Sequence, residues 1–593
     1  MLVRLKWVSM LIIVVTVSVL LTACGSDTTD QTVESPVQGD GEEPADVLVA
    51  PAGPSTAGDG IMVTSNFADA TTLNPILAPD AASYTVVNNL FLSLLSVEEF
   101  SGEIVGKIAD SWTASEDGLT YTFNLRDDIF WTDGIPVTSR DVKFTYEAMS
   151  SDLVDTPHRG NVEMIESINI IDDYSLDIVF RTMDCSVLYN FFLGILPSHM
   201  YAADFSDIMS SPLNEEPTVT NGPFKFLEWV KDDHITLVRN ENYYLGPPNL
   251  EGWIYRIFAD NTAMLAAFLA GEVDLTNIGP QFSALIENEI NEGQPFIKKE
   301  FFNDGYTFVG FNLADPENPQ PGWIDSDGDG VFAEDEAPNL DQDPHPILSD
   351  PLVRKAIAHS LDYTNIINEV VYGKGAPIAA NVLPTINWAY NNELEPYAYD
   401  PVMAAELLDE AGWVLEDEEE VRTKDGELLS LSILTNAGND ARENIALLLQ
   451  DDLSGIGFDI TLDILEWGTV VSQLMGQQFD MVVMGWIGMG ADPDDSAIWA
   501  YRYDDPGDGF NFISYYNEEV EEKVWQARAV KGCSDDERGG IYKEIQAMIH
   551  DDAPYAFLYN PQGIMIWNTR LTEINPGPWS TYYNVHQWYL SPQ

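Results

Sequence analysis

The chain has 593 residues, 45% of them hydrophobic, which is enough to form the cores of two or three domains. Its 97 acidic and 27 basic residues give a formal charge of −70. Because nucleic acid is bound through clustered Lys and Arg, this balance argues against nucleic acid as a partner. It is typical of a secreted or surface protein, or of one that lives in high salt.

The N-terminus has the pattern of a lipoprotein signal peptide over residues 1–23. Two basic residues precede an apolar core at residues 8–21, which is short for a membrane span. The core ends in the letters LTAC, and this ending resembles a bacterial lipobox. The resemblance implies cleavage before Cys24 and acylation of its thiol and new amine, which would anchor the protein to a membrane. A transmembrane anchor is the alternative.

Residues 24–60 form a predicted flexible tether. The segment is rich in Thr, Asp, Glu, Pro, Gly and Ser and contains no Lys or Arg. The folded body is expected to begin near Ile61, where the letters MVTSNF open as a strand.

The stretch Gly118–Met149 predicts a strand, a turn and a capped helix in one run. Apolar and polar residues alternate over residues 119–126, which is the period of a half-buried strand. Thr138, followed three residues later by Asp141, predicts a capping box at the start of a helix.

Further strands and helices are expected along the rest of the chain. Asp-Pro pairs predict capped helix starts, and Gly predicts helix ends. The predicted strands are 224–230, 234–240, 457–467 and 479–486, and the predicted helices are 261–272, 350–371, 400–412 and 444–453.

An acidic loop at residues 325–336 fits the calcium-loop pattern DxDxDGxxxxxE in full. Calcium takes six to eight oxygen ligands, which carboxylates and a backbone carbonyl can supply. The expected ligands are Asp325, Asp327, Asp329, the Val331 carbonyl and Glu336. Flanking prolines disfavour a helix on either side, so we expect a lone loop that closes an insertion at 315–348. A solvated acidic insertion is the alternative.

Several segments, in order, resemble extracellular solute-binding proteins of family 5, the peptide, nickel and oligosaccharide receptors of ABC importers. The segments that carry the resemblance are 118–149, 221–244, 268–275, 350–362, 400–413 and 479–486. The resemblance covers nearly everything from Ile61 to Gln593, and the succession is more specific than any one segment.

The resemblance implies an α/β bilobal fold of the periplasmic-binding-protein type, in the type II, three-domain class with mixed sheets flanked by helices. Its domains would be 61–95 with 215–303 and 557–593, then 96–214, then 304–556. The implied protein is an extracytoplasmic, lipid-anchored monomer, on the periplasmic or cell-surface side. It would capture an oligopeptide-like solute between its lobes and deliver it to a permease and ATPase.

Aromatic side chains are the implied walls of the ligand cleft, because they bury a large area with little loss of rotamer freedom. Trp467 and Trp486 match positions that contact ligand in oligopeptide-binding relatives, and Tyr84 is a weaker candidate. The chain has 15 Trp, so most of them must be structural, and packing in a core is the alternative for each.

One departure from the peptide-binding pattern concerns the ammonium of the ligand. Met489 stands where peptide-binding relatives often carry an Asp, and a thioether cannot hold an ammonium. Asp492 follows in the sequence and would substitute only if the loop shifts. Oligosaccharide binding by the same fold, or a calcium-dependent surface sensory role, therefore stays open.

Three further points concern chemistry. Cys185 and Cys533 would be able to pair outside the cytoplasm, but a free buried thiol is an equal alternative. Hydrolase motifs such as GxSxG and HExxH do not occur in the sequence, so no enzyme is expected. The seven His lack metal-ligand spacing, so the sequence gives no support for a nickel site.

Overall fold

The computed structural model describes residues 60–66, 68–162, 164–326, 336–417, 419–488, 490–507 and 509–591. They belong to one compact unit, Pro54–Gln593. The predicted signal peptide and tether, with Cys24, lie outside the described residues. Among the helices of the described part, none combines the length and apolarity needed to cross a bilayer.

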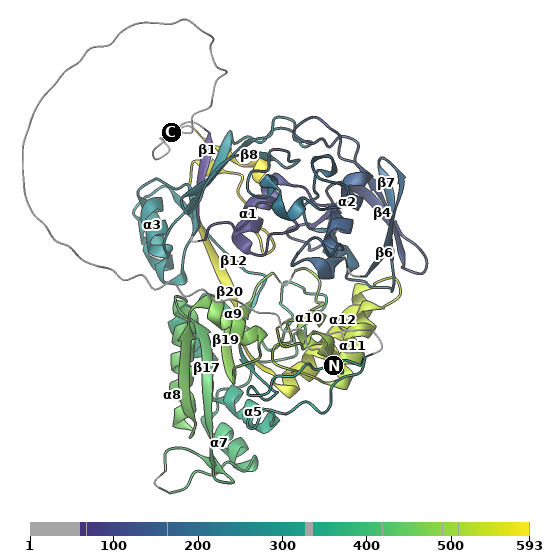
Figure 1. The fold of residues 1–593 in the computed structure, drawn as a ribbon. Helices are drawn as coiled ribbons and strands as arrows, with labels where there is room; N and C mark the ends of the chain where they lie inside the picture. The colour runs from purple at the N-terminus through teal and green to yellow at the C-terminus, as the bar shows by residue number, and fades with distance from the viewer. Residues whose placement is uncertain are drawn as a thin grey trace, which may run out of the picture. The chain divides into compact units, whose positions relative to one another are not determined.

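A large mixed sheet extends through this unit, in the order β18-β17-β19-β13-β20-β11-β1-β10-β9-β8 (Figure 1). The long strand β20 lies in the middle of this order and joins the two halves of the sheet, because its first residues pair with β13 and its last pair with β11 and β12. The strands are β1 (Ile61–Asn66), β8 (Phe224–Val230), β9 (His234–Arg239), β10 (Gly252–Ile257), β11 (Leu275–Asn277), β12 (Phe296–Phe302), β13 (Tyr306–Phe311), β14 (Gly375–Pro377), β17 (Ser430–Asn436), β18 (Asp459–Leu465), β19 (Met481–Trp486) and β20 (Tyr555–Asn568).

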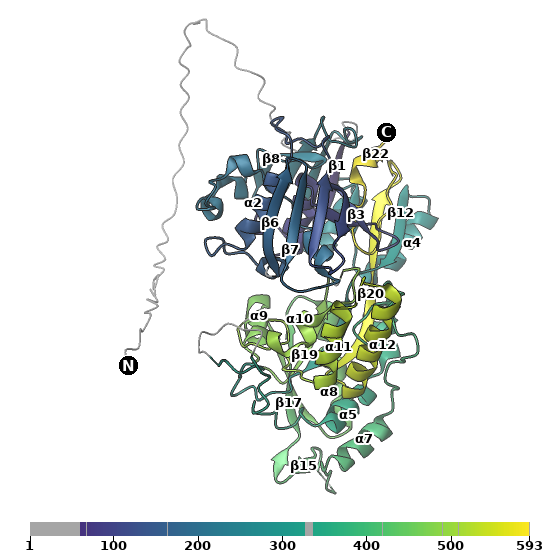
Figure 2. The ribbon, with the colours of Figure 1, turned by 90° about the vertical axis from the view of Figure 1, so that its right-hand side faces the viewer.

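A second sheet is antiparallel and four-stranded, in the order β4-β5-β7-β6 (Figure 2). Its strands are β4 (Ala109–Ala114), β5 (Thr120–Leu125), β6 (Ile165–Asp172) and β7 (Ser175–Phe180). Short pairs are β2 (Leu95–Val97) with β3 (Ile104–Gly106), β15 (Thr423–Lys424) with β16 (Glu427–Leu428), and β21 (Leu571–Thr572) with β22 (Tyr589–Leu590).

Helices cover the sheets and close four apolar clusters. The cluster with the second sheet includes residues of α1 (Ala81–Leu90) and α2 (Ser139–Met149), and a smaller cluster holds α3 (Asn261–Leu269) and α4 (Ser283–Asn291). On the β17–β19 side, one cluster includes α5 (Pro351–Ser360), α7 (Pro401–Glu410) and α8 (Asp440–Gly455). Another includes α9 (Trp467–Met475), α10 (Ser496–Trp499), α11 (Glu518–Arg528) and α12 (Asp535–Asp552). The predicted domain borders stay predictions. The apolar cluster that contains α1 and α2 includes residues of both of the first two predicted domains.

The strand, turn and helix expected at residues 118–149 are confirmed as β5 and α2. Tyr121, Phe123 and Leu125 are buried, as the alternation predicts. The capping box is present, with the Thr138 N–H donating to Asp141 Oδ2 at 2.8 Å.

The helix starts at the two Asp-Pro pairs are also confirmed. Asp350 accepts from the Leu352 N–H at 2.9 Å, and Asp400 accepts from the Val402 N–H at 3.1 Å. One expectation was wrong: the helix predicted at 350–371 ends at Ser360. The backbone of Leu361 is extended, with φ −85° and ψ 121°, which ends the first helix. Asp362 then caps a new short helix, α6 (Tyr363–Asn365), by accepting from the Asn365 N–H.

Candidate solute-binding site

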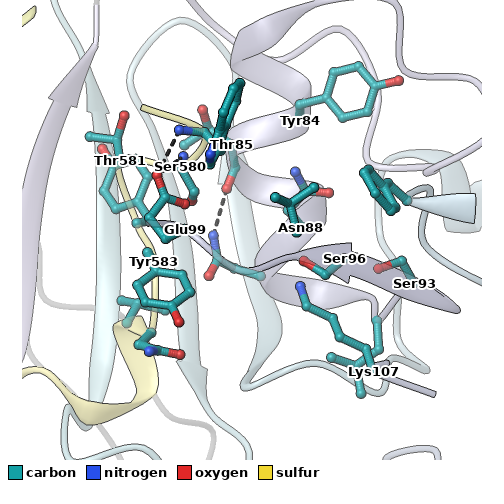
Figure 3. Close-up of a pocket in the computed structure, with 18 of the residues that line it drawn as sticks. Tyr84, Thr85, Asn88, Ser93, Ser96, Glu99, Lys107, Ser580, Thr581 and Tyr583 are labelled. Carbon is teal, nitrogen blue, oxygen red and sulfur yellow. Dashed lines mark hydrogen bonds between the residues drawn. The ribbon is translucent and has the colours of Figure 1, made fainter. Parts of the chain in front are cut away.

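A cavity of about 800 Å³ lies beside α1 and the β2–β3 pair. Helix α1 contributes Tyr84, Thr85 and Asn88 to its wall, and the chain segment 579–586 forms a second wall (Figure 3). Asp304, Ile487 and Gly488, which lie next to β13 and β19, also line it. The volume falls within the range of about 300–1,000 Å³ usual for small-molecule sites.

One side of the cavity carries two carboxyl groups, the buried Glu99 and the half-buried Asp304. Glu99 is 1% exposed, and its Oε1 accepts the backbone N–H groups of Trp579 at 2.7 Å and Ser580 at 2.9 Å. Burial raises the pKa of Glu99 to about 7, although these two hydrogen bonds oppose the rise. Burial likewise raises the pKa of Asp304 to about 6. The backbone of segment 579–586 therefore orients the Glu99 carboxyl group at an acidic edge of the cavity.

Another side of the cavity carries Lys107, which follows β3. Its backbone N–H donates to the Leu94 carbonyl at 3.2 Å, which ties the residue to the start of β2. Figure 3 shows its ammonium directed into the space that Asn88 and Ser96 also border. Burial lowers the pKa of this ammonium below its ordinary value. The cavity thus places a cationic group and an acidic edge around one space.

The family model for bacterial extracellular solute-binding proteins, family 5, matches residues 103–508. The chain belongs to this family. It is 26% identical over 549 residues to the oligopeptide-binding protein AppA of Bacillus subtilis, covering 91% of this chain and 92% of that one. A probable di/tripeptide-binding protein of Pseudomonas aeruginosa is 24% identical over 86% of this chain and 91% of that protein.

Solved structures show the same fold. The structure of AppA in complex with a nonapeptide matches with a TM-score of 0.74 and 25% identity, over 91% of this chain and all (100%) of that one. NikZ of Campylobacter jejuni, in complex with Ni(L-His), matches with a TM-score of 0.73 and 24% identity, over 90% and 99%. The α/β bilobal fold expected from the sequence is therefore confirmed, and the chain is a family 5 solute-binding protein.

Of the predicted ligand residues, Tyr84 lines the cavity of this family 5 protein. Its hydroxyl lies 2.8 Å from Nε2 of His158, which also lies 2.7 Å from the Ala78 carbonyl. Burial, aided by Asp80, raises the pKa of Tyr84 to about 12. The phenol is thus a neutral, oriented group at the cavity wall.

Neither of the two predicted tryptophans lines this cavity. Trp486 packs in an apolar cluster, with its ring 5.5 Å from that of Phe512 and 6.3 Å from that of Phe308. Its neighbours Ile487 and Gly488 line the cavity in its place. Trp467 begins α9, is 48% exposed, and lies 5.9 Å below the Arg442 guanidinium. Their roles in ligand contact stay predictions.

Asp492 forms an ion pair with Arg538 and does not face the cavity. Both of its carboxylate oxygens accept from Arg538, at 2.7 and 2.8 Å, and both residues are buried. In this conformation the carboxylate is engaged by the guanidinium and does not line the cavity, so the loop shift needed to hold a ligand ammonium has not occurred. Met489, the other residue of this prediction, lies outside the described residues.

The open question of the two cysteines is answered by the structure. Cys185 and Cys533 form a disulfide with their Cα atoms 5.3 Å apart. Charged contacts surround it: Arg528 pairs with Asp184, and Arg528 Nε lies 3.5 Å from Asp494 Oδ2. The disulfide therefore joins the segment after β7 to the connection between α11 and α12. Strand β7 contributes to one apolar cluster, and α11 and α12 contribute to another.

The predicted calcium loop is described only at its ends, Asp325 and Glu336. The flanks approach each other, since the Ile324 N–H donates to the Ala337 carbonyl at 2.9 Å. Glu336 is 5% exposed and its Oε1 accepts from the Ser326 N–H at 2.7 Å. Asp327, Asp329 and Val331 lie outside the described residues. Within the described residues no cluster of three or more His, Cys, Asp or Glu is grouped to hold a metal.

Sequence reasoning missed Glu99, Lys107, Asp304 and the segment 579–586. None stands in a motif, and the two acidic residues are two of 97 in a chain rich in carboxylates. Glu99 with Lys107, Asp304, and segment 579–586 come from three distant parts of the sequence, and only folding brings them to one cavity.

Proposed function

We propose that this protein captures an oligopeptide-like solute in the cavity and delivers it to the permease and ATPase of an ABC importer. The observation that carries the proposal is an 800 Å³ cavity with charged groups of both signs, in a chain similar over 91% of its length to an oligopeptide-binding protein. The protein acts as a monomer and by binding alone, without catalysis.

The composition of the cavity wall supports a peptide over a neutral sugar. Tyr84, Tyr244 and Trp579 provide aromatic surface against which a peptide backbone can lie. Lys107 is half-buried and has no carboxylate within ion-pair distance among the described residues, so a neutral solute would leave its ammonium without a counter-charge. An oligosaccharide receptor of the same fold remains the second candidate, since aromatic walls suit sugar rings equally.

A thermal-shift titration with short peptides and with neutral oligosaccharides tests the proposal. We expect peptides to raise the melting temperature and Tyr84→Ala to weaken that shift, because it removes aromatic surface from the cavity. Tyr399→Ala is the matched control, since Tyr399 is 49% exposed and lies outside the cavity lining. A shift produced by oligosaccharides and by no peptide would replace the proposal with the second candidate.

We also propose that Cys24 carries the lipid anchor and that the protein stands outside the cytoplasm, on the periplasmic or cell-surface side of the membrane. The support is the lipobox resemblance and the extracellular family. Cells fed a labelled fatty acid should incorporate it into the wild type and not into a Cys24→Ser variant. Label in that variant, or recovery of the uncleaved signal sequence in the wild type, would contradict lipidation.

A third proposal is that the loop at residues 325–336 binds structural calcium. Its support is the acid spacing together with the close approach of its two ends, which places Asp325 and Glu336 at the base of one loop. Calcium would supply charge neutralisation to an otherwise self-repelling insertion. A calcium-dependent surface sensory protein is the alternative role that this loop leaves open, and it predicts solute binding that depends on calcium.

A further inference from the structure

Lys107 is the lysine that lines the described cavity, and it has no acidic partner among the described residues. Within the described part of the chain no carboxylate lies within ion-pair distance, 4.0 Å, of its ammonium, and no hydrogen bond of its side chain is found. By contrast, Lys298 and Lys374 lie 3.0 and 2.8 Å from Glu300. In a protein with 97 acids, a half-buried cation that faces a cavity without a carboxylate beside it is costly unless a ligand supplies the charge.

The acidic edge of the cavity stands apart from this cation. Figure 3 shows Glu99 beside the segment 579–586 and Lys107 on another side of the same space. Two backbone N–H groups donate to one oxygen of Glu99, Oε1, and so orient its carboxyl group, and Asp304 lies near it on the acidic edge. A solute that complements both sides must carry a negative group at one place and a positive group at another.

We propose that Lys107 is the anion-recognition residue of the cavity, pairing with a carboxylate of the solute, while the side of Glu99 and Asp304 receives the solute's ammonium. The preferred solute is then a zwitterion with free ends. This deepens the proposed function and rests on it, because a peptide with free termini is the zwitterion that the relatives point to. Neither the Lys107 ammonium nor the acidic edge of Glu99 and Asp304 depends on Met489 or Asp492, the residues considered for the ligand ammonium from the sequence.

The test compares tri- to pentapeptide libraries with free C-termini, with C-terminal amides, and with N-acetylated N-termini, using native mass spectrometry. We expect the wild type to bind the free acids about 10- to 100-fold more tightly than the amides. Lys107→Met should remove this preference, and Lys107→Arg should retain it. Lys531→Met is the matched control, since Lys531 is exposed and outside the cavity lining.

A comparison of free and N-acetylated peptides tests the side of the cavity that would receive the solute's ammonium. The wild type should bind the N-acetylated library more weakly than the free library, and Glu99→Gln should reduce that difference. Unfolding measured by circular dichroism confirms that the variants are folded. Equal binding of acids and amides by the wild type, or an unchanged preference in folded Lys107→Met, overturns the assignment of Lys107. An unchanged N-acetyl effect in folded Glu99→Gln overturns the assignment of the acidic edge.

A parallel arm separates this proposal from the proposed function. Oligogalacturonates and their methyl esters present the same contrast of carboxylate and neutral group without a peptide. If only these sugar acids bind and Lys107→Met removes their advantage over the esters, the peptide function fails while the role of Lys107 stands. If no carboxylate of either class binds more tightly than its neutral counterpart, Lys107 is not the anion-recognition residue.

Discussion

Removal of the Cys185–Cys533 disulfide should destabilise the protein substantially. The bond closes a loop with a sequence separation of 348 residues. In the chain-entropy model, a loop of this length restricts the unfolded state by about 6 kcal/mol at 25 °C, and removal of native disulfides usually costs about 2–5 kcal/mol. We therefore expect Cys185→Ser/Cys533→Ser to lower the free energy of unfolding by an amount in that measured range.

Urea unfolding followed by circular dichroism, with and without reductant, measures this effect. Reductant should destabilise the wild type to the level of the double variant and should leave the double variant unchanged, which is the internal control. The double substitution avoids an odd thiol that would form intermolecular bonds. Equal stability of the oxidised wild type and the double variant would show that the bridge does not form or does not restrict the chain.

Three further predictions follow from buried charges and the acidic loop. Arg538→Met should cost about 3–5 kcal/mol in urea unfolding, because it leaves buried Asp492 without its ion-pair partner, and Arg538→Met/Asp492→Leu should recover most of it; a double variant as unstable as the single one would contradict this. The raised pKa of Glu99, about 7 against an ordinary 4.5, means that its contribution to stability is complete below about pH 4.5 and is lost as pH rises through 7. Wild type should therefore lose more unfolding free energy between pH 5 and pH 8, roughly the span of that shift, than Glu99→Gln, and equal slopes would refute it. Calcium should raise the melting temperature of the wild type and a chelator should lower it, while Glu336→Gln should respond to neither; a chelator without effect on the wild type would remove the calcium proposal.

The framework of the fold was predictable because it depends on local patterns. The alternation of Tyr121, Phe123 and Leu125 set the buried face of β5, and Asp350 and Asp400 set the starts of α5 and α7. These signals act within a few residues, so the sequence carries them directly. The break after Ser360 escaped prediction because the apolar pattern continues across it, while Asp362 starts a new turn.

The cavity was much less predictable. Tyr84 was anticipated, but Trp486 packs against Phe512 and leaves its neighbours to line the space. Whether a ring faces a core or a cavity depends on tertiary packing over distances that no local spacing encodes. Lys107 and Glu99 come together with the C-terminal segment only in the folded chain, for the same reason.

The most direct test of the account is to identify the solute that the protein retains when it is isolated from the cells that make it. Native mass spectrometry of the gently purified protein, followed by release and fragmentation of the bound molecule, gives that identity. The account predicts short peptides with free amino and carboxyl ends. A bound neutral oligosaccharide or a metal chelate, with no peptide present, would contradict it.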